Sequence, residues 1–176
     1  MKSFKTTTLA SLLIILISCG GPKRPSANGV DSFMEFLTLK IDLAESSFDN
    51  FMIGIPKKGD DKMIGFMMPT LHKMMMKQIK EERVSINTSR TFEADEKTKK
   101  LSEELKEAGI NIIEAYIQGG EQELDEVKTL VAKGETINSP NVTALLSKFE
   151  VRLKKEYNTF DKIQKELAKE YNIIMY

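Results

Sequence analysis

Sulfur and imidazole side chains are concentrated in one short segment of this sequence. Residues 63–76 hold six of the ten methionines and the only histidine. On a helix, Met68, His72 and either Met75 or Met76 would share one face, because side chains four and seven or eight positions apart lie above one another. Thioether and imidazole groups are suitable ligands for Cu(I). The spacing therefore indicates Met68, His72 and Met75 as candidate metal ligands.

Packing is the alternative interpretation of the same segment, and it is the one we favour. Met63, Met67, Leu71 and Met74 form a plain apolar face at helical spacing. Methionine also fills irregular gaps in protein cores, because its side chain is unbranched and flexible. A Met-rich groove that binds another protein is a third interpretation.

Recognisable motifs for catalysis are missing from the sequence. It has no Cys–His pair, no HExxH helix, no glycine-rich phosphate loop and no GxSxG turn. Acidic pairs occur at 103–104 and within 121–126, but lysines accompany them on polar helix faces, which is typical of solvated surface. We therefore expect no catalytic residues, no cofactor and no enzymatic activity.

The only cysteine, Cys19, follows an export signal. Lys2 and Lys5 supply a positive start, and residues 9–17 are predominantly apolar. This apolar run is shorter than the roughly 20 residues that a membrane-spanning helix needs. A lone exported thiol would also be open to oxidation or to pairing with another chain. The pattern predicts a cleaved signal peptide over residues 1–18.

The tetrad Leu16-Ile17-Ser18-Cys19, followed by Gly20, resembles the lipobox of bacterial lipoproteins that signal peptidase II processes. The resemblance implies a diacylglyceryl thioether on the sulfur of Cys19 and, in many bacteria, a further acyl chain on its new amino group. Two or three acyl chains hold a protein firmly to a membrane. We therefore expect a lipid-anchored protein of the bacterial envelope, in the outer membrane.

Charge and composition limit the remaining possibilities. The chain has 26 basic and 26 acidic residues, and loss of a leader containing Lys2 and Lys5 leaves 24 basic residues against 26 acidic ones. That balance argues against a nucleic-acid partner, which favours basic surfaces. Gly, Pro, Ser and Asn dominate residues 20–30 and predict a flexible tether. The expected organisation is a signal peptide over 1–18, a lipidated tether over 19–31 and one domain over 32–176.

Apolar residues recur at intervals of three and four through most of this domain, which predicts amphipathic helices. The expected helical segments are 32–54, 61–84, 91–120, 121–133 and 139–176. No segment alternates for long enough to predict a strand. The sequence therefore predicts an all-α protein, an elongated up-and-down helical bundle whose long C-terminal helix is the central element.

Local signals set the expected helix boundaries. Ser32 begins a capping-box pattern, and Ser139 followed by Pro140 is typical of a helix start. Pro69 should either kink the second helix or open a new one. Residues 84–90 are polar and β-branched, which favours a loop. The last apolar stripe suits burial within the bundle, with self-association through the C-terminal helix as the alternative.

A further resemblance covers residues 48–84. An aromatic helix, Gly54-Ile55, Lys57-Lys58 and then Ile64-Gly65-Phe66 are similar to the variable large surface lipoproteins of Borrelia. That family consists of lipid-anchored, largely helical surface antigens implicated in immune evasion and host contact. The resemblance implies a surface antigen or adhesin that binds a host or envelope macromolecule. A periplasm-facing accessory lipoprotein of an envelope complex is the alternative, and copper capture is the third.

Overall fold

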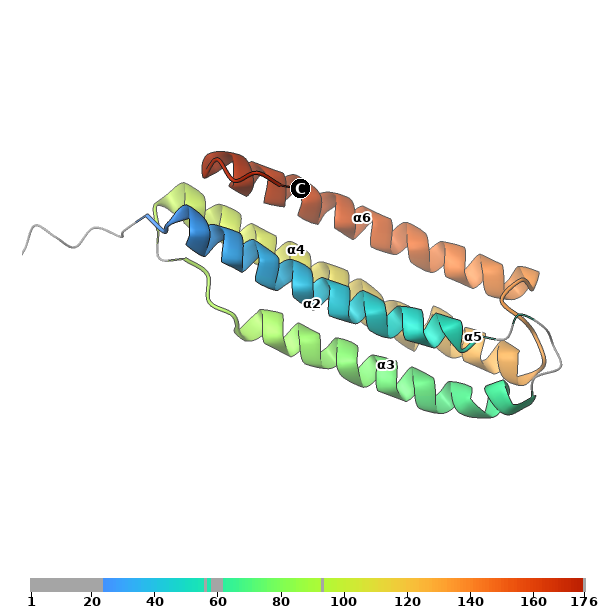
Figure 1. Cartoon of the computed structure of the whole chain (residues 1–176). Coiled ribbons are helices and arrows are strands. Elements are labelled where there is room, and N and C mark those ends of the chain that lie inside the picture. Colours follow the sequence, from blue (N-terminus) through green and yellow to red (C-terminus); the bar gives the residue numbers. More distant parts are fainter. Residues whose placement is uncertain (1–23, 56, 58–61, 93, 176) are drawn as a thin grey trace, which may run out of the picture.

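The computed structural model describes residues 24–55, 57, 62–92 and 94–175, and these form five helices (Figure 1). The helices are α2 (Ala27–Ile53), α3 (Lys62–Thr88), α4 (Glu96–Glu121), α5 (Glu123–Ala132) and α6 (Pro140–Glu170). Helices α4 and α5 follow one another in a single rod, so the five helices form four rods that run up and down. The predicted all-α bundle with a long C-terminal helix is confirmed. The expected signal peptide and Cys19 lie outside the described residues.

Helix α4 is the central element of the bundle. It contacts α2, α3, α5 and α6, whereas α6 packs mainly on α4 and touches α2 only sparsely. The expectation that the C-terminal helix would be central is therefore wrong, although α6 is the longest helix with 31 residues. The peripheral position of α6 follows from its apolar pattern, because α6 has one narrow apolar stripe whereas α4 buries residues on several sides.

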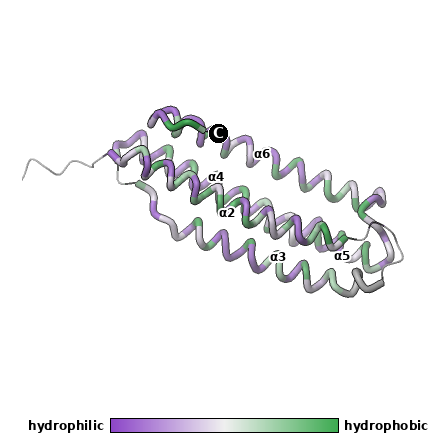
Figure 2. Tube along the Cα trace, in the orientation of Figure 1, coloured by the Kyte–Doolittle hydropathy of each residue, from purple (hydrophilic) through white to green (hydrophobic). Residues whose placement is uncertain are grey.

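The predicted apolar stripes of four helices face the core. Figure 2 shows hydrophobic and hydrophilic residues alternating along each rod, as expected for amphipathic helices. Fully or nearly fully buried members of these stripes are Phe33, Leu37, Ile41, Ala44, Leu101, Leu105, Ala108, Ile112, Tyr116, Leu124, Val127, Val131, Val142, Phe149, Leu153, Phe160 and Leu167. Periodicity was sufficient for these residues because they recur at helical spacing on faces that the bundle buries.

Two glycines near the end of α4 allow side chains from its neighbours to approach its backbone. A Cβ atom at Gly119 would overlap the ring of Phe149 on α6, and one at Gly120 would overlap the sulfur of Met76 on α3. The Phe149 ring also packs against Tyr116, with ring centroids 5.7 Å apart. Helix α4 includes both glycines and ends at Glu121, one residue beyond the predicted boundary at residue 120.

The first helix begins earlier than predicted. Ser26, not Ser32, is the N-cap, and its hydroxyl accepts a hydrogen bond from the Gly29 amide at 3.1 Å. Val30 is already completely buried. Residues 27–31, which were expected in the tether, therefore belong to α2, because the Ser26 cap and the burial of Val30 favour helix over extended chain.

The middle boundaries also differ from the expectation. Helix α3 continues through Pro69 and reaches Thr88, so the loop predicted for 84–90 is wrong over most of its length. Burial explains this extension, because Ile86 is completely buried in the core. Tertiary packing thus outweighs the weak helix propensity of the local β-branched and polar residues.

Both ends of α6 refine the prediction. Pro140 occupies the first helical turn as expected, but the Ser139 hydroxyl accepts a hydrogen bond from the Thr136 amide rather than capping the helix. The helix ends at Glu170 instead of continuing to residue 176. Asn172 adopts a φ of 53°, and the last described residues double back along α6 (Figure 1).

We predict that Gly119→Ala lowers the free energy of unfolding by about 2 kcal/mol, because the added methyl group must displace the buried Phe149 ring. Urea denaturation followed by circular dichroism measures the effect. Gly29→Ala is the matched control, since its Cβ would meet only the Ser26 hydroxyl at 3.4 Å. An equal loss of stability in both variants would show that the Phe149 contact is not the cause.

Candidate functional site

Arg24 fastens the chain that enters the bundle to the end of its last helix. Its Nη2 donates hydrogen bonds to the Glu170 carbonyl oxygen at 3.0 Å and to Glu170 Oε1 at 3.1 Å. Its guanidinium lies 4.6 Å from the centre of the Tyr171 ring. Lys97 of α4 pairs with the same carboxylate. We call Arg24, Lys97, Glu170 and Tyr171 the Arg24 clasp.

The clasp is connected to the cap of α4. Tyr171 Oη lies 3.0 Å from Thr98 Oγ1, and Thr98 Oγ1 donates to Asp95 Oδ2 at 2.8 Å. The Thr98 hydroxyl proton is thus engaged by Asp95, so Tyr171 is the donor to Thr98. Asp95 also accepts the Thr98 amide at 3.0 Å, and this bond contributes most to lowering the pKa of its carboxyl. Three chain segments meet at this one end of the bundle.

Electrostatics favour the charged form of Glu170 in the clasp. The hydrogen bond from Lys97 is the main reason that the pKa of Glu170 lies below its usual value, and the charge of Arg24 lowers it further. Desolvation of the carboxylate opposes this shift. Arg24 and Lys97 are largely exposed to solvent, so salt screens their attraction to Glu170.

The predicted lipidation residue, Cys19, lies outside the described residues, but its distance from the clasp is bounded. Five residue steps separate Cys19 from Arg24. A chain advances at most about 3.6 Å per residue, so Cys19 is within about 18 Å of Arg24 in any conformation. The sequence alone predicts Arg24 within the flexible tether, because its partners are more than 70 positions away and leave no local pattern.

The structure places the candidate copper ligands in or beside the core. Met68 is completely buried and Met75 almost completely, whereas Met67 and Met74, which the packing interpretation expected inside, are exposed. The segment thus packs as favoured, but through a different face. The prediction of the face was wrong because every face of this segment carries methionine, so periodicity could not select one.

His72 is engaged by the backbone of α4. Its Nε2 lies 2.7 Å from the Gly120 carbonyl oxygen, which requires Nε2 to carry the proton and donate. The ring also packs edge-on against Phe51, with 5.8 Å between ring centroids. A metal bound to Nε2 would displace this hydrogen bond. Packing thus accounts for the positions of Met68, His72 and Met75.

One acidic residue expected at the surface is buried. Glu123, in the first turn of α5, is 1% exposed, so its assignment to a solvated face is corrected. Its Oε1 accepts from Arg152 Nη2 at 2.8 Å and from Lys148 Nζ at 2.9 Å, both on α6. Burial tends to raise the pKa of Glu123, but these two bonds outweigh it and the pKa is lowered. The cluster ties α5 to α6.

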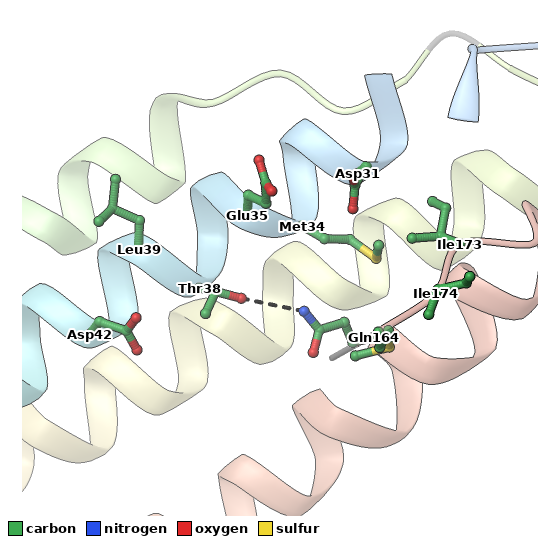
Figure 3. A pocket seen from close by; sticks show the side chains of 10 residues that line it. Asp31, Met34, Glu35, Thr38, Leu39, Asp42, Gln164, Ile173 and Ile174 are labelled. Atoms are coloured by element: carbon green, nitrogen blue, oxygen red, sulfur yellow. Dashed lines mark hydrogen bonds between the residues drawn. The ribbon is translucent and has the colours of Figure 1, made fainter. Parts of the chain in front are cut away.

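A groove runs between α2 and the C-terminal end of α6 (Figure 3). Its volume is about 420 Å³, and Asp31, Glu35 and Asp42 of α2 lie along it. Leu39 and the tail residue Ile174 supply apolar surface. We call it the acidic groove. The acidic residues of α2 recur on one side of the helix, a pattern in the sequence that apolar periodicity does not detect.

Other kinds of site find no support in the described part of the chain. No group of three or more His, Cys, Asp and Glu side chains there is arranged to hold a metal ion. None of the described helices combines the length and the apolar character required to cross a bilayer.

No protein-family model matches the chain, and the comparisons with curated proteins and with solved structures find no similar protein.

We predict that Glu123→Gln destabilises the protein by about 2 kcal/mol at pH 7, because it leaves the Arg152 guanidinium without its counter-charge. The folded-state pKa of Glu123 is below the usual 4.5, so its contribution is present above pH 4.5 and is lost as the pH falls through the folded pKa. The difference between wild type and variant should therefore shrink below pH 4.5. Chemical denaturation at several pH values measures it.

Asp125→Asn is the control for this prediction. Its ion pair with Lys128 is half exposed, so the expected loss is below about 1 kcal/mol. A Glu123→Gln effect no larger than that of Asp125→Asn would contradict a structural role for the buried cluster.

Proposed function

We propose that this chain is a lipid-anchored, non-enzymatic protein of the bacterial outer membrane, exposed at the cell surface as an antigen or adhesin that binds a host or envelope macromolecule. The observation that carries the proposal is the short span between Cys19, at the end of a lipobox-like tetrad, and Arg24 in the clasp. An acylated Cys19 would hold this end of the bundle close to the bilayer.

The geometry of the bundle supports presentation at a surface. The clasp lies at one end, and the end of α2, the start of α3 and the α5–α6 connection lie at the other (Figure 1). Helix α2 alone, with 27 residues, extends about 40 Å at 1.5 Å per residue. With the anchor at the clasp end, the bundle projects away from the membrane and its sides are open to a macromolecular partner.

The contacts of the partly buried His72 and the buried Glu123 support a binding role rather than catalysis. His72 donates to a backbone carbonyl, and Glu123 forms ion pairs with Arg152 and Lys148. These contacts join helices to one another. A catalytic acid, base or nucleophile needs a group that can reach a substrate, and these groups are already engaged in packing.

We predict that Cys19→Ala transfers the protein from the detergent phase to the aqueous phase in detergent phase-partitioning, because it removes the only site for thioether lipidation. Ser3→Ala is the matched control, since it changes the leader without touching Leu16-Ile17-Ser18-Cys19. Wild type and Cys19→Ala both found in the aqueous phase, with the same processed mass, would contradict the anchor.

Orientation is tested by proteolysis of intact cells. We predict that added protease degrades the bundle without permeabilisation, whereas a periplasmic marker protein in the same cells stays intact. Survival of the bundle until the outer membrane is permeabilised would refute surface exposure and favour the periplasm-facing accessory role.

A further inference from the structure

The acidic face of α2 differs from the other charged faces of the bundle. Its carboxylates follow one another at intervals of four, seven, three and four residues, which places them along one side of the helix: Asp31, Glu35, Asp42, Glu45 and Asp49. None of the five forms an ion pair with a cation among the described residues. The only basic residue of α2, Lys40, pairs instead with Glu82 of α3 at 3.0 Å.

Acidic residues on the other helices have cationic partners far more often. Glu103 and Glu104 pair with lysines one turn away, Glu114 pairs with Arg83, and Glu121 pairs with Lys80. The five carboxylates on the acidic face of α2, which we call the α2 stripe, thus carry an uncompensated negative potential along the helix. A potential of this kind attracts a cationic partner and repels phosphate groups and anionic lipid.

Apolar surface lies beside these carboxylates in the acidic groove. Leu39 is 54% exposed and Ile174 is 74% exposed, and both line the groove together with the buried Met34. Figure 3 shows Met34 and Ile174 between α2 and the returning tail, and Leu39 farther along α2. Gln164 of α6 bridges to Thr38 at 3.3 Å. The groove therefore combines an apolar surface with an acidic rim.

A partner that is both cationic and apolar complements both features. The groove opens because α6 packs on α4 and leaves α2 partly uncovered. An amphipathic helix fits such a seam with its apolar face inward. Basic residues seven positions apart on that helix would recur every 10.5 Å or so, which matches the seven-residue interval between Glu35 and Asp42.

We propose that the acidic groove binds a cationic amphipathic helical peptide segment. This inference names a partner for the binding role proposed above, but it does not depend on lipidation. Carboxylates of the α2 stripe pair with lysine or arginine, while Leu39 and Ile174 contact the apolar face of the peptide. Three carboxylates that line the groove, Asp31, Glu35 and Asp42, supply most of the attraction.

The test uses the full chain in a nonionic detergent and a fluorescein-labelled 18-residue peptide of leucine and lysine at helical spacing. Fluorescence anisotropy reports binding, and detergent alone gives the background. We expect the triple variant Asp31→Asn, Glu35→Gln, Asp42→Asn to bind at least tenfold more weakly. The control variant Glu103→Gln, Glu107→Gln, Glu126→Gln changes the net charge equally on α4 and α5 and should stay within twofold of wild type.

A second pair of variants tests the apolar contact. Leu39→Gln should weaken binding several-fold, whereas Val84→Gln, at a similarly exposed position on α3, should not. Circular dichroism verifies that all variants fold.

Three results would overturn the proposal. The first is an equal weakening of peptide binding in both triple variants, and the second is an anisotropy change no larger than that with detergent alone. The third is a dimer of the chain, detected by analytical ultracentrifugation, that excludes the peptide. The last would assign the groove to a second copy of the chain. Because peptide binding is measured whether or not Cys19 is acylated, failure here is distinguishable from failure of the anchor.

Discussion

Close approach of side chains to the backbone of α4 determines the arrangement of the whole bundle. Gly119 admits the Phe149 ring and Gly120 admits the Met76 sulfur, so α6 and α3 are both drawn towards α4. His72 adds a hydrogen bond to the Gly120 carbonyl at the same level. Interiors are close-packed, so a helix held this tightly to one neighbour cannot also contact every other neighbour equally.

The exposed side of α2 follows from this preference. Since α6 lies against α4, α2 keeps a solvent-facing strip between itself and α6, and the sequence places carboxylates there rather than more apolar side chains. Tyr157 and Gln164 of α6 bridge part of the strip through hydrogen bonds to Glu45 and Thr38. Polar bridges of this kind hold two helices at a fixed separation without closing the space between them.

Helix periodicity predicted the fold class and most of the core, but it could not predict long-range pairing. The burial of Glu123 depends on Arg152, 29 positions later, and the attachment of Arg24 depends on Glu170, 146 positions later. Local signals were also unreliable where several interpretations suited the same residues. Ser139 had the composition of a cap yet bonds to Thr136, and the methionines of α3 offered two apolar faces of which the core uses only one.

The Arg24 clasp also has a mechanical consequence. With an anchor at Cys19, a pull on the far end of the bundle is resisted at the point where the chain enters it. Arg24 shares this load with α6 through Glu170 and with α4 through Lys97, instead of leaving it on the first turn of α2. The helices are then loaded along their axes, so separation requires whole helix faces to slide past one another.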